Sequence, residues 1–262
     1  MKNIRHINIE TTKICNQSCF YCFNDSGTKS IEKTLTPENW LKKLEPFVMQ
    51  GLKSVHLTGG EPFAYPYIIE LINSCVDLGL TTSILSNGLK ISLLIKKHPE
   101  TFKKLSLAQI SLDSLIPEKQ NKRRGYKYAF KDAITAIQSL HKIGVPLEIS
   151  MTVDSENELE INDIIKFAKK YNAKLIVRPM VNKGRAVNSY IKSITREELN
   201  NIQKTSNTDI VEDRFLYVTE HSTNHECLLK EGVLTLKPDS TIDSEYLNNI
   251  EINNLSQLRV AS

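Results

Sequence analysis

Short apolar stretches alternate with longer amphipathic stretches from Ile7 to Arg178. Period-two alternation and β-rich composition predict strands, and apolar residues three and four apart predict helices. Strands are expected at Ile7–Thr11, Ser54–Thr58, Thr81–Leu85, Ala108–Leu112, Leu147–Val153 and Lys174–Arg178. Helices are expected at about residues 37–50, with Thr36 as N-cap, 67–78, within 90–97, 129–142 and 159–171. Crossovers of this length fit parallel strands.

Six strand–helix units predict an α/β fold, either an open sheet or a barrel short of the eight units of a closed one. The pattern changes after Ala186, where shorter elements follow. These are a helix at Thr195–Lys204, strands at Phe215–Val218 and Val233–Lys237, a turn at Pro238–Ser240 and a helical turn at Leu255–Leu258.

The composition is that of an ordinary globular protein. The chain has 262 residues, 40% of them hydrophobic and 24% charged, with a net charge of +4. The basic run Lys119–Arg124 is interpreted as a solvated face, or as a contact for an acidic substrate or redox partner. The sequence contains neither a signal peptide nor a long apolar run. We therefore expect a cytoplasmic protein, with no membrane span and no nucleic-acid partner.

Three cysteines stand close together near the start of the chain. Cys15, Cys19 and Cys22 form a C-x3-C-x2-C pattern, whereas Cys75 and Cys227 are remote. Three thiolates can hold an iron–sulfur cluster and leave one iron open, whereas closed clusters usually take four cysteines. The alternatives are a zinc site, completed by His6 or by a remote residue, and a set of free thiols. Cys75 lies on an apolar helical stripe and is expected in the core.

Four further motifs lie at or just after the ends of predicted strands. They are Gly59–Pro62 (GGEP), Ser86–Gly88 (SNG), Ile110–Asp113 (ISLD) and the segment from Arg178 through Gly184, Arg185 and Ala186. Ligands of α/β folds bind at the carboxyl ends of strands. Together with the cysteines, these motifs resemble the radical S-adenosylmethionine (radical SAM) superfamily over roughly residues 6–186.

The resemblance implies a partial (β/α)6 TIM-like barrel, one [4Fe-4S] cluster and S-adenosyl-L-methionine (SAM). Cys15, Cys19 and Cys22 would bind the cluster. The SAM contacts implied are Tyr21, Gly59, Gly60, Glu61, Pro62, Ser86, Asn87, Ser111, Asp113 and Arg123, with Arg124 as the alternative arginine. Each has a structural alternative: turn formation at the glycines and Asn87, packing at Tyr21, strand capping at Ser111 and Asp113.

The C-terminal part is similar to the SPASM or twitch extensions of peptide-modifying members. Cys227 precedes a hairpin with a Pro238–Asp239 turn, but the later cysteines of such extensions are absent. We therefore expect a radical SAM core at residues 1–190 and a degenerate extension, a short α+β region without a second cluster, at residues 191–262. His221, His225 and Cys227 are a weaker candidate metal site.

The resemblance implies that one electron from flavodoxin or ferredoxin leads to cleavage of SAM and to a 5′-deoxyadenosyl radical that abstracts hydrogen from a substrate. A ribosomally made peptide is the favoured substrate, with a cross-link, thioether or epimer as product. Because only 14 residues precede Cys15, a separate leader-binding protein is expected. The alternatives are a small-molecule enzyme for nucleotides or tetrapyrroles, and a non-catalytic iron–sulfur or SAM-binding protein.

Overall fold

Six parallel strands form the centre of the molecule and follow the predicted ranges closely. The computed structural model describes residues 4–29, 34–195, 197–198, 201, 211–212, 233–237 and 242–243. The strands are β1 (His6–Glu10), β2 (Ser54–Thr58), β3 (Thr81–Ser86), β4 (Leu107–Ser111), β5 (Leu147–Val153) and β6 (Lys174–Pro179). Every neighbouring pair among them is parallel.

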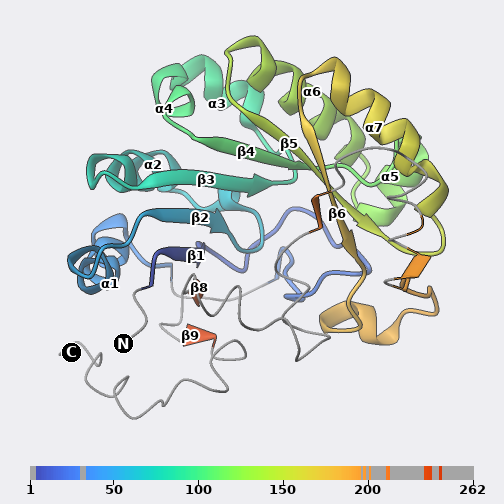
Figure 1. Cartoon of the computed structure of the whole chain (residues 1–262), viewed down its shortest axis with the longest axis horizontal. Helices are drawn as coiled ribbons and strands as arrows, with labels where there is room; N and C mark the ends of the chain where they lie inside the picture. Colours follow the sequence, from blue (N-terminus) through green and yellow to red (C-terminus); the bar gives the residue numbers. More distant parts are fainter. Residues whose placement is uncertain are drawn as a thin grey trace.

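The sheet is curved and open. Its strand order is β7-β6-β5-β4-β3-β2-β1-β8-β9, so β1 and β6 do not pair with each other. Helices cover the outer, convex face, as Figure 1 shows, and the concave face looks toward the loops that follow the strands. The expected α/β fold with a partial barrel is confirmed.

The covering helices begin and end within a few residues of their predicted limits. They are α1 (Pro37–Met49), α2 (Ile68–Asp77), α3 (Ile91–Lys97), α6 (Ala129–Lys142) and α7 (Ile161–Lys170). Thr36 caps α1, since its side chain accepts a hydrogen bond from the Asn39 backbone N–H at 3.4 Å. Three short 3-10 helices, η1 (Pro62–Ala64), η2 (Glu158–Glu160) and η3 (Gly184–Asn188), lie in the connections.

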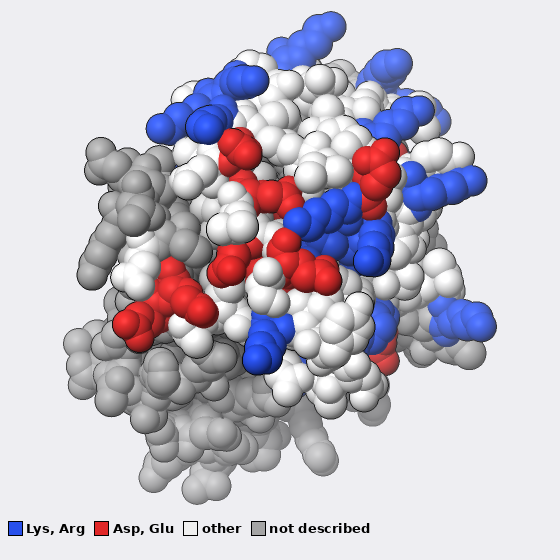
Figure 2. Space-filling view, turned by 90° about the vertical axis from the view of Figure 1, so that its right-hand side faces the viewer, with Lys and Arg blue, Asp and Glu red and all other residues white. Residues whose placement is uncertain are grey.

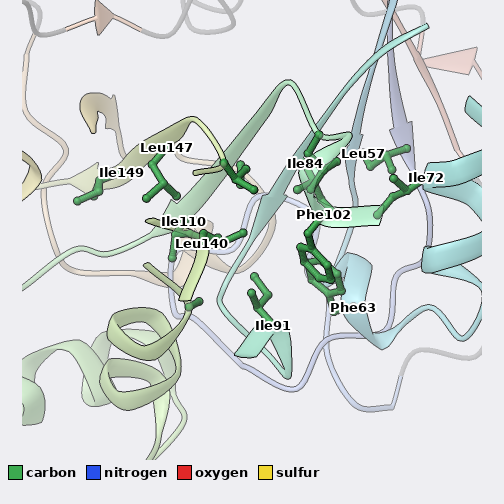
Figure 3. Packing of buried hydrophobic residues seen from close by; sticks show 14 of the residues in the cluster. Leu57, Phe63, Ile72, Ile84, Ile91, Phe102, Ile110, Leu140, Leu147 and Ile149 are labelled. Atoms are coloured by element: carbon green, nitrogen blue, oxygen red, sulfur yellow. The ribbon is translucent and has the colours of Figure 1, made fainter. Parts of the chain in front are cut away.

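The core lies between the sheet and these helices. Outward-facing strand residues such as Leu57 and Ile84 pack against apolar helix residues, as Figure 3 shows. Phe63 and Phe102 stack with their ring centroids 5.7 Å apart, and both are buried. Truncating a buried phenylalanine of this kind typically costs about 3–5 kcal/mol. Cys75 belongs to this core, as expected. The packing gives the strand ends a firm support.

The interpretation of the basic run Lys119–Arg124 as a solvated face is only partly right. The run forms most of α5 (Pro117–Arg124), a helix that the apolar pattern did not predict, as it did not predict α4 (Pro99–Lys103). Gln120, Arg123 and Arg124 are buried, whereas Lys122 is exposed. Residues three and four apart share one helix face. That face packs on the ends of β4 and β5, so only the other face of this run is solvated.

The C-terminal strands extend the sheet at both edges. β8 (Val233–Leu236) pairs in parallel with β1 and confirms the strand predicted at Val233–Lys237. β9 (Ile242–Asp243) pairs antiparallel with β8, and β7 (Val211–Glu212), which was not predicted, pairs with β6. The predicted elements at Phe215–Val218 and Leu255–Leu258 lie outside the described residues.

Several other predictions also fall on residues that are not described. They concern His221, His225, Cys227, the turn at Pro238–Ser240 and most of the helix at Thr195–Lys204. The boundary between residues 190 and 191 stays a prediction.

The surface mixes charges of both signs. On the face turned to the viewer in Figure 2, acidic side chains lie directly beside basic ones. Lys119 forms an ion pair with Glu160, and Arg185 pairs with Asp25 at 2.8 Å. Among the described residues, no helix has both the length and the apolar character that a membrane span requires.

Candidate active site

A cavity of about 740 Å³ lies within the curve of the sheet. Its lining includes the last residue of each of four neighbouring strands, Glu10, Thr58, Ser86 and Ser111. The loop that follows β1 closes one side; residues 11–29 of it are described, and we call them the cysteine loop. The predicted motifs therefore meet at the edge of the sheet where α/β folds bind ligands.

Two glycines after β2 let the cysteine loop come close to the sheet. A Cβ atom at Gly60 would overlap the carbonyl oxygens of Lys13 and Ile14, and one at Gly59 would overlap that of Thr12. Gly60 N–H donates to Thr12 O at 2.6 Å. Only residues without a side chain permit this approach. The glycines of GGEP thus act on the loop backbone as well as forming the cavity wall.

The three loop cysteines line the same cavity, and nitrogen donors reach two of their sulfurs. Gln17 N–H lies 3.4 Å from Cys15 Sγ, and an Arg124 guanidinium nitrogen lies 4.0 Å from Cys19 Sγ. Burial raises the pKa of Cys15 to about 12, and burial also raises the pKa of Cys19. A bound metal would compensate the thiolate charge that burial otherwise disfavours.

These cysteines fit an iron–sulfur cluster better than a zinc ion. Among the described residues, no three His, Cys, Asp or Glu side chains converge around a point where one ion could bind. In a cubic cluster each cysteine binds a different iron, so the sulfurs need not meet around one ion. His6, the proposed fourth zinc ligand, instead contacts Ser54 Oγ at 2.7 Å at the start of the sheet. The donor set therefore fits the cluster.

Glu61 is a buried carboxylate that ties the end of β2 to the end of β3. It accepts hydrogen bonds from Ser86 Oγ at 2.8 Å and from the Phe63 and Asn87 backbone N–H groups at 2.9 and 2.8 Å. Burial raises its pKa to about 7, although these hydrogen bonds favour the ionised form. Asn87 in turn donates to Asn16 Oδ1 at 2.8 Å in the cysteine loop. GGEP and SNG thus form one unit with that loop.

A second buried network holds the other side of the cysteine loop. The Tyr21 hydroxyl donates to Asp113, which also accepts from Arg124 Nη2 at 2.9 Å and from Thr152 N–H at 2.9 Å. The Arg124 guanidinium carbon lies 5.4 Å from the centroid of the Tyr21 ring. Asp113 is fully buried and engaged in these contacts. It lies behind the cavity wall.

The structure separates the two candidate arginines. Arg124 lines the cavity, where it also pairs with Asp113 at 2.9 Å, whereas Arg123 is outside the lining. Arg123 turns the other way and forms a bidentate pair with Asp154, at 3.0 and 2.7 Å. A helix turns by about 100° per residue, so adjacent residues face different surroundings. The geometry therefore favours Arg124 over Arg123 for a carboxylate in the cavity.

The structure brings most of the predicted site residues together. Those that line the cavity are Cys15, Cys19, Cys22, Tyr21, Gly59, Gly60, Glu61, Ser86, Asn87 and Ser111. Those outside the lining are Pro62, which is buried in η1, and the paired residues Asp113 and Arg123. A direct SAM contact of these three residues remains a prediction that the geometry does not favour.

Sequence reasoning missed a polar inner wall on β4, β5 and β6. Arg178 donates to Ser150 Oγ and, at 3.2 Å, to Gln109 Oε1. Gln109 donates to Glu148 at 2.6 Å. The available signal was the alternation of polar with apolar residues along β5, since alternate residues face opposite sides. On β1, Glu10 also lines the cavity.

Comparisons with known proteins agree with this arrangement. The model of the radical SAM superfamily matches residues 9–168. A probable GTP 3′,8-cyclase of Pyrococcus horikoshii is 34% identical over 65% of this chain and 54% of that protein. The sporulation killing factor maturation protein SkfB of Bacillus subtilis is 28% identical over 60% of this chain and 38% of that protein. The chain thus spans about half the length of these relatives, or less.

A solved structure has the same fold. The crystal structure of Streptococcus suis SuiB bound to S-adenosylmethionine superposes with a TM-score of 0.70 at 17% sequence identity. The match covers 92% of this chain and 60% of that chain. The family model covers more than half of the sequence and includes the cysteine loop, GGEP, SNG and Asp113. From these matches we conclude that the chain belongs to the radical SAM superfamily.

Proposed function

We propose that this protein is a radical SAM enzyme that modifies a ribosomally made peptide. The observation that carries the proposal is the meeting, in one cavity, of the three loop cysteines with the GGEP and SNG motifs. Cys15, Cys19 and Cys22 would hold one [4Fe-4S] cluster. When bound, the cluster supplies the electron that splits SAM into methionine and a 5′-deoxyadenosyl radical, which takes a hydrogen atom from the substrate.

The chain's own residues would bind SAM and position it. Gly59 and Gly60 expose backbone groups at the cavity, and Glu61 holds Ser86 and Asn87 in place beside them. Arg124 brings a guanidinium group, whose planar fork suits a carboxylate, to the lining of the cavity. Tyr21 adds an aromatic face beside Cys22.

The inner wall supports a peptide substrate. Besides Arg178 and Gln109, it presents hydroxyl groups from Ser150 and Thr152. Such neutral donors and acceptors suit backbone amides and polar side chains. The likeness to SkfB, which by its name matures a sporulation killing factor, supports the same substrate class.

A nucleotide is the second candidate, because the chain is 34% identical to a probable GTP 3′,8-cyclase. A triphosphate needs several cations around it. In the described part of the chain, the cavity is lined by the cations Arg124, Arg178 and Arg185, and two of them have carboxylate partners, Asp113 and Asp25. This charge balance favours the peptide.

The test begins with anaerobic reconstitution of the full chain with iron and sulfide. We expect a cluster by visible absorbance and, after reduction with dithionite and addition of SAM, 5′-deoxyadenosine by chromatography. An intact cluster without 5′-deoxyadenosine would instead support a non-catalytic SAM-binding protein. Without any cluster, both iron–sulfur proposals fail.

Substrate choice is tested in the same assay. Short peptides encoded beside the gene are compared with GTP, and a mass change in the peptide supports the proposal. A cyclised nucleotide would replace it with the second candidate. Flavodoxin and ferredoxin are our proposed reductants, and each is tested in place of dithionite. A separate leader-binding protein is proposed as the partner that presents the peptide, and its addition should raise the rate of peptide modification.

A further inference from the structure

Arg185 connects the segment after β6 to the cysteine loop. Its Nε donates to Cys19 O at 2.8 Å, and its Nη1 donates to Ser26 O at 2.7 Å. The same Nη1 pairs with Asp25 Oδ1 at 2.8 Å. The Arg185 backbone N–H donates to Cys22 O at 3.0 Å. One residue thus binds the backbone carbonyls of two of the three cysteines.

The preceding residue makes this contact sterically feasible. Gly184 adopts a φ of +60°, and a Cβ atom there would overlap the carbonyl oxygens of Cys22 and Phe23. Only glycine combines this backbone conformation with such a close approach. Gly184 and Arg185 therefore form a single clamp, in which the backbone of one segment rests on the other.

The clamp spans the turn that carries Cys19 and Cys22. Within that turn the backbone makes one bond, from Cys22 N–H to Cys19 O at 3.2 Å. Arg185 binds the loop at Cys19, where the turn begins, and beyond the end of the turn at Asp25 and Ser26. A planar guanidinium can direct its donors to several acceptors at once, whereas a lysine ammonium is a compact point charge.

We propose that Arg185 is a positioning residue that fixes the separation of Cys19 and Cys22 and so retains the cluster. This inference rests on the proposed role of the cysteines. The role differs from that of Arg124, which approaches the Cys19 sulfur from α5, because Arg185 acts on the loop backbone. A surface ion pair with Asp25 is the competing explanation, and the Asp25 side chain is 68% exposed. Exposed pairs contribute little to stability.

The experiment measures iron release from the reconstituted full chain to an iron(II) chelator under anaerobic conditions. R185Q removes both the positive charge and the planar guanidinium donors of Arg185, whereas R185K keeps the charge alone. D25N removes only the ion pair with Asp25. Asparagine tolerates the φ of 49° at Asp25. K192Q removes a charge from the same connecting segment, where only the backbone of Lys192 contacts Ser155.

We expect iron release about tenfold faster in R185Q, which corresponds to losing one or two charge-assisted hydrogen bonds. R185K should be intermediate, and D25N and K192Q should stay within about twofold of wild type, as exposed charges do. At equal cluster content, the electron paramagnetic resonance spectrum of reduced R185K should differ from wild type. The melting temperatures of the cluster-free proteins should be alike.

Equal release rates in wild type and R185Q would overturn the inference, as would an effect of D25N as large as that of R185Q. Should R185Q fail to fold, the iron-release rates of R185K and D25N are compared instead. Release from R185K that is no faster than release from D25N would overturn the inference. A wild-type chain that takes up no cluster overturns the proposed function and this inference with it. A wild type that holds its cluster while the variants match it overturns the inference alone.

Discussion

The two walls of the cavity are built in different ways. Beside β1, β2 and β3, the wall depends on backbone contacts, with Gly60 against the cysteine loop and Glu61 bound to backbone N–H groups. Beside β4, β5 and β6, it depends on side chains that contact one another, such as Arg178 and Gln109. The first wall requires particular residues, because only glycine fits there. The second requires only polarity at alternate positions, so it can vary while the fold stays the same.

The comparison assigns different tasks to the walls. We infer that the backbone wall positions the cluster and SAM and that the side-chain wall selects the substrate. Changes in the first should abolish chemistry with any substrate. Changes in the second should leave SAM cleavage intact and alter only what is modified.

The largest effect is expected from C19S, in the backbone wall. A serine oxygen is a poor ligand for cluster iron, so cluster absorbance and 5′-deoxyadenosine should both be lost. C75S is the matched control, since Cys75 is buried in the core and is not among the residues that line the cavity. It should lower the melting temperature yet keep the cluster. Iron analysis of both variants checks this, and a full cluster in C19S would contradict the assignment.

The second-largest effect is expected from G60A. Its methyl group would overlap the Ile14 carbonyl and push the cysteine loop from the sheet. Overpacking of this kind costs about 3 kcal/mol, and cluster uptake should fall with it. G79A adds a methyl group where nothing lies within 4 Å, at a φ of +77°. It should cost about 1 kcal/mol from backbone strain alone and leave cluster uptake unchanged. Denaturation and iron content separate the two variants.

The same contrast explains what the sequence could predict. The strands and the backbone wall were predictable because apolar alternation and glycine motifs mark them directly. The structure places the residues predicted from these motifs together at the cavity: the three loop cysteines, Gly59, Gly60, Ser86 and Asn87. A backbone that must approach another backbone leaves a glycine in the sequence.

Helix α5 and its buried arginines could not be predicted, because ion pairs rather than apolar contacts hold these side chains in the interior. α5 has no apolar stripe, so its buried face was taken for a solvated one. Arg123 is buried against Asp154, and Arg124 against Asp113, partners remote in the sequence. Two adjacent arginines look alike until those partners are known. The polar inner wall escaped notice because serine and threonine on a strand also suit a solvent-exposed face.

A third prediction concerns Glu61 and pH. Its folded pKa of about 7 lies above its ordinary value of 4.5, so the folded state holds the proton more tightly. Protonated Glu61 therefore adds to the free energy of unfolding, and this contribution is fully present below pH 4.5. It falls as the pH rises from 4.5 to 7, and above pH 7 the free energy of unfolding changes no further through Glu61. The loss should be about 3 kcal/mol. Thermal melts of the cluster-free protein should show this slope, and E61Q should flatten it. An equal slope in E61Q would assign it to other groups.

The smallest effect is expected in the side-chain wall. S150A removes the Ser150 hydroxyl that accepts a hydrogen bond from Arg178. Cluster content and SAM cleavage without substrate should match wild type, because Ser150 contacts neither motif of the backbone wall. The KM for the modified substrate should rise about fivefold, as expected for a net loss of about 1 kcal/mol. S139A is the control, since Ser139 lies on α6 in the outer layer and bonds Thr135 O. If S150A instead lowers SAM cleavage without substrate, the walls do not divide their tasks as the comparison implies.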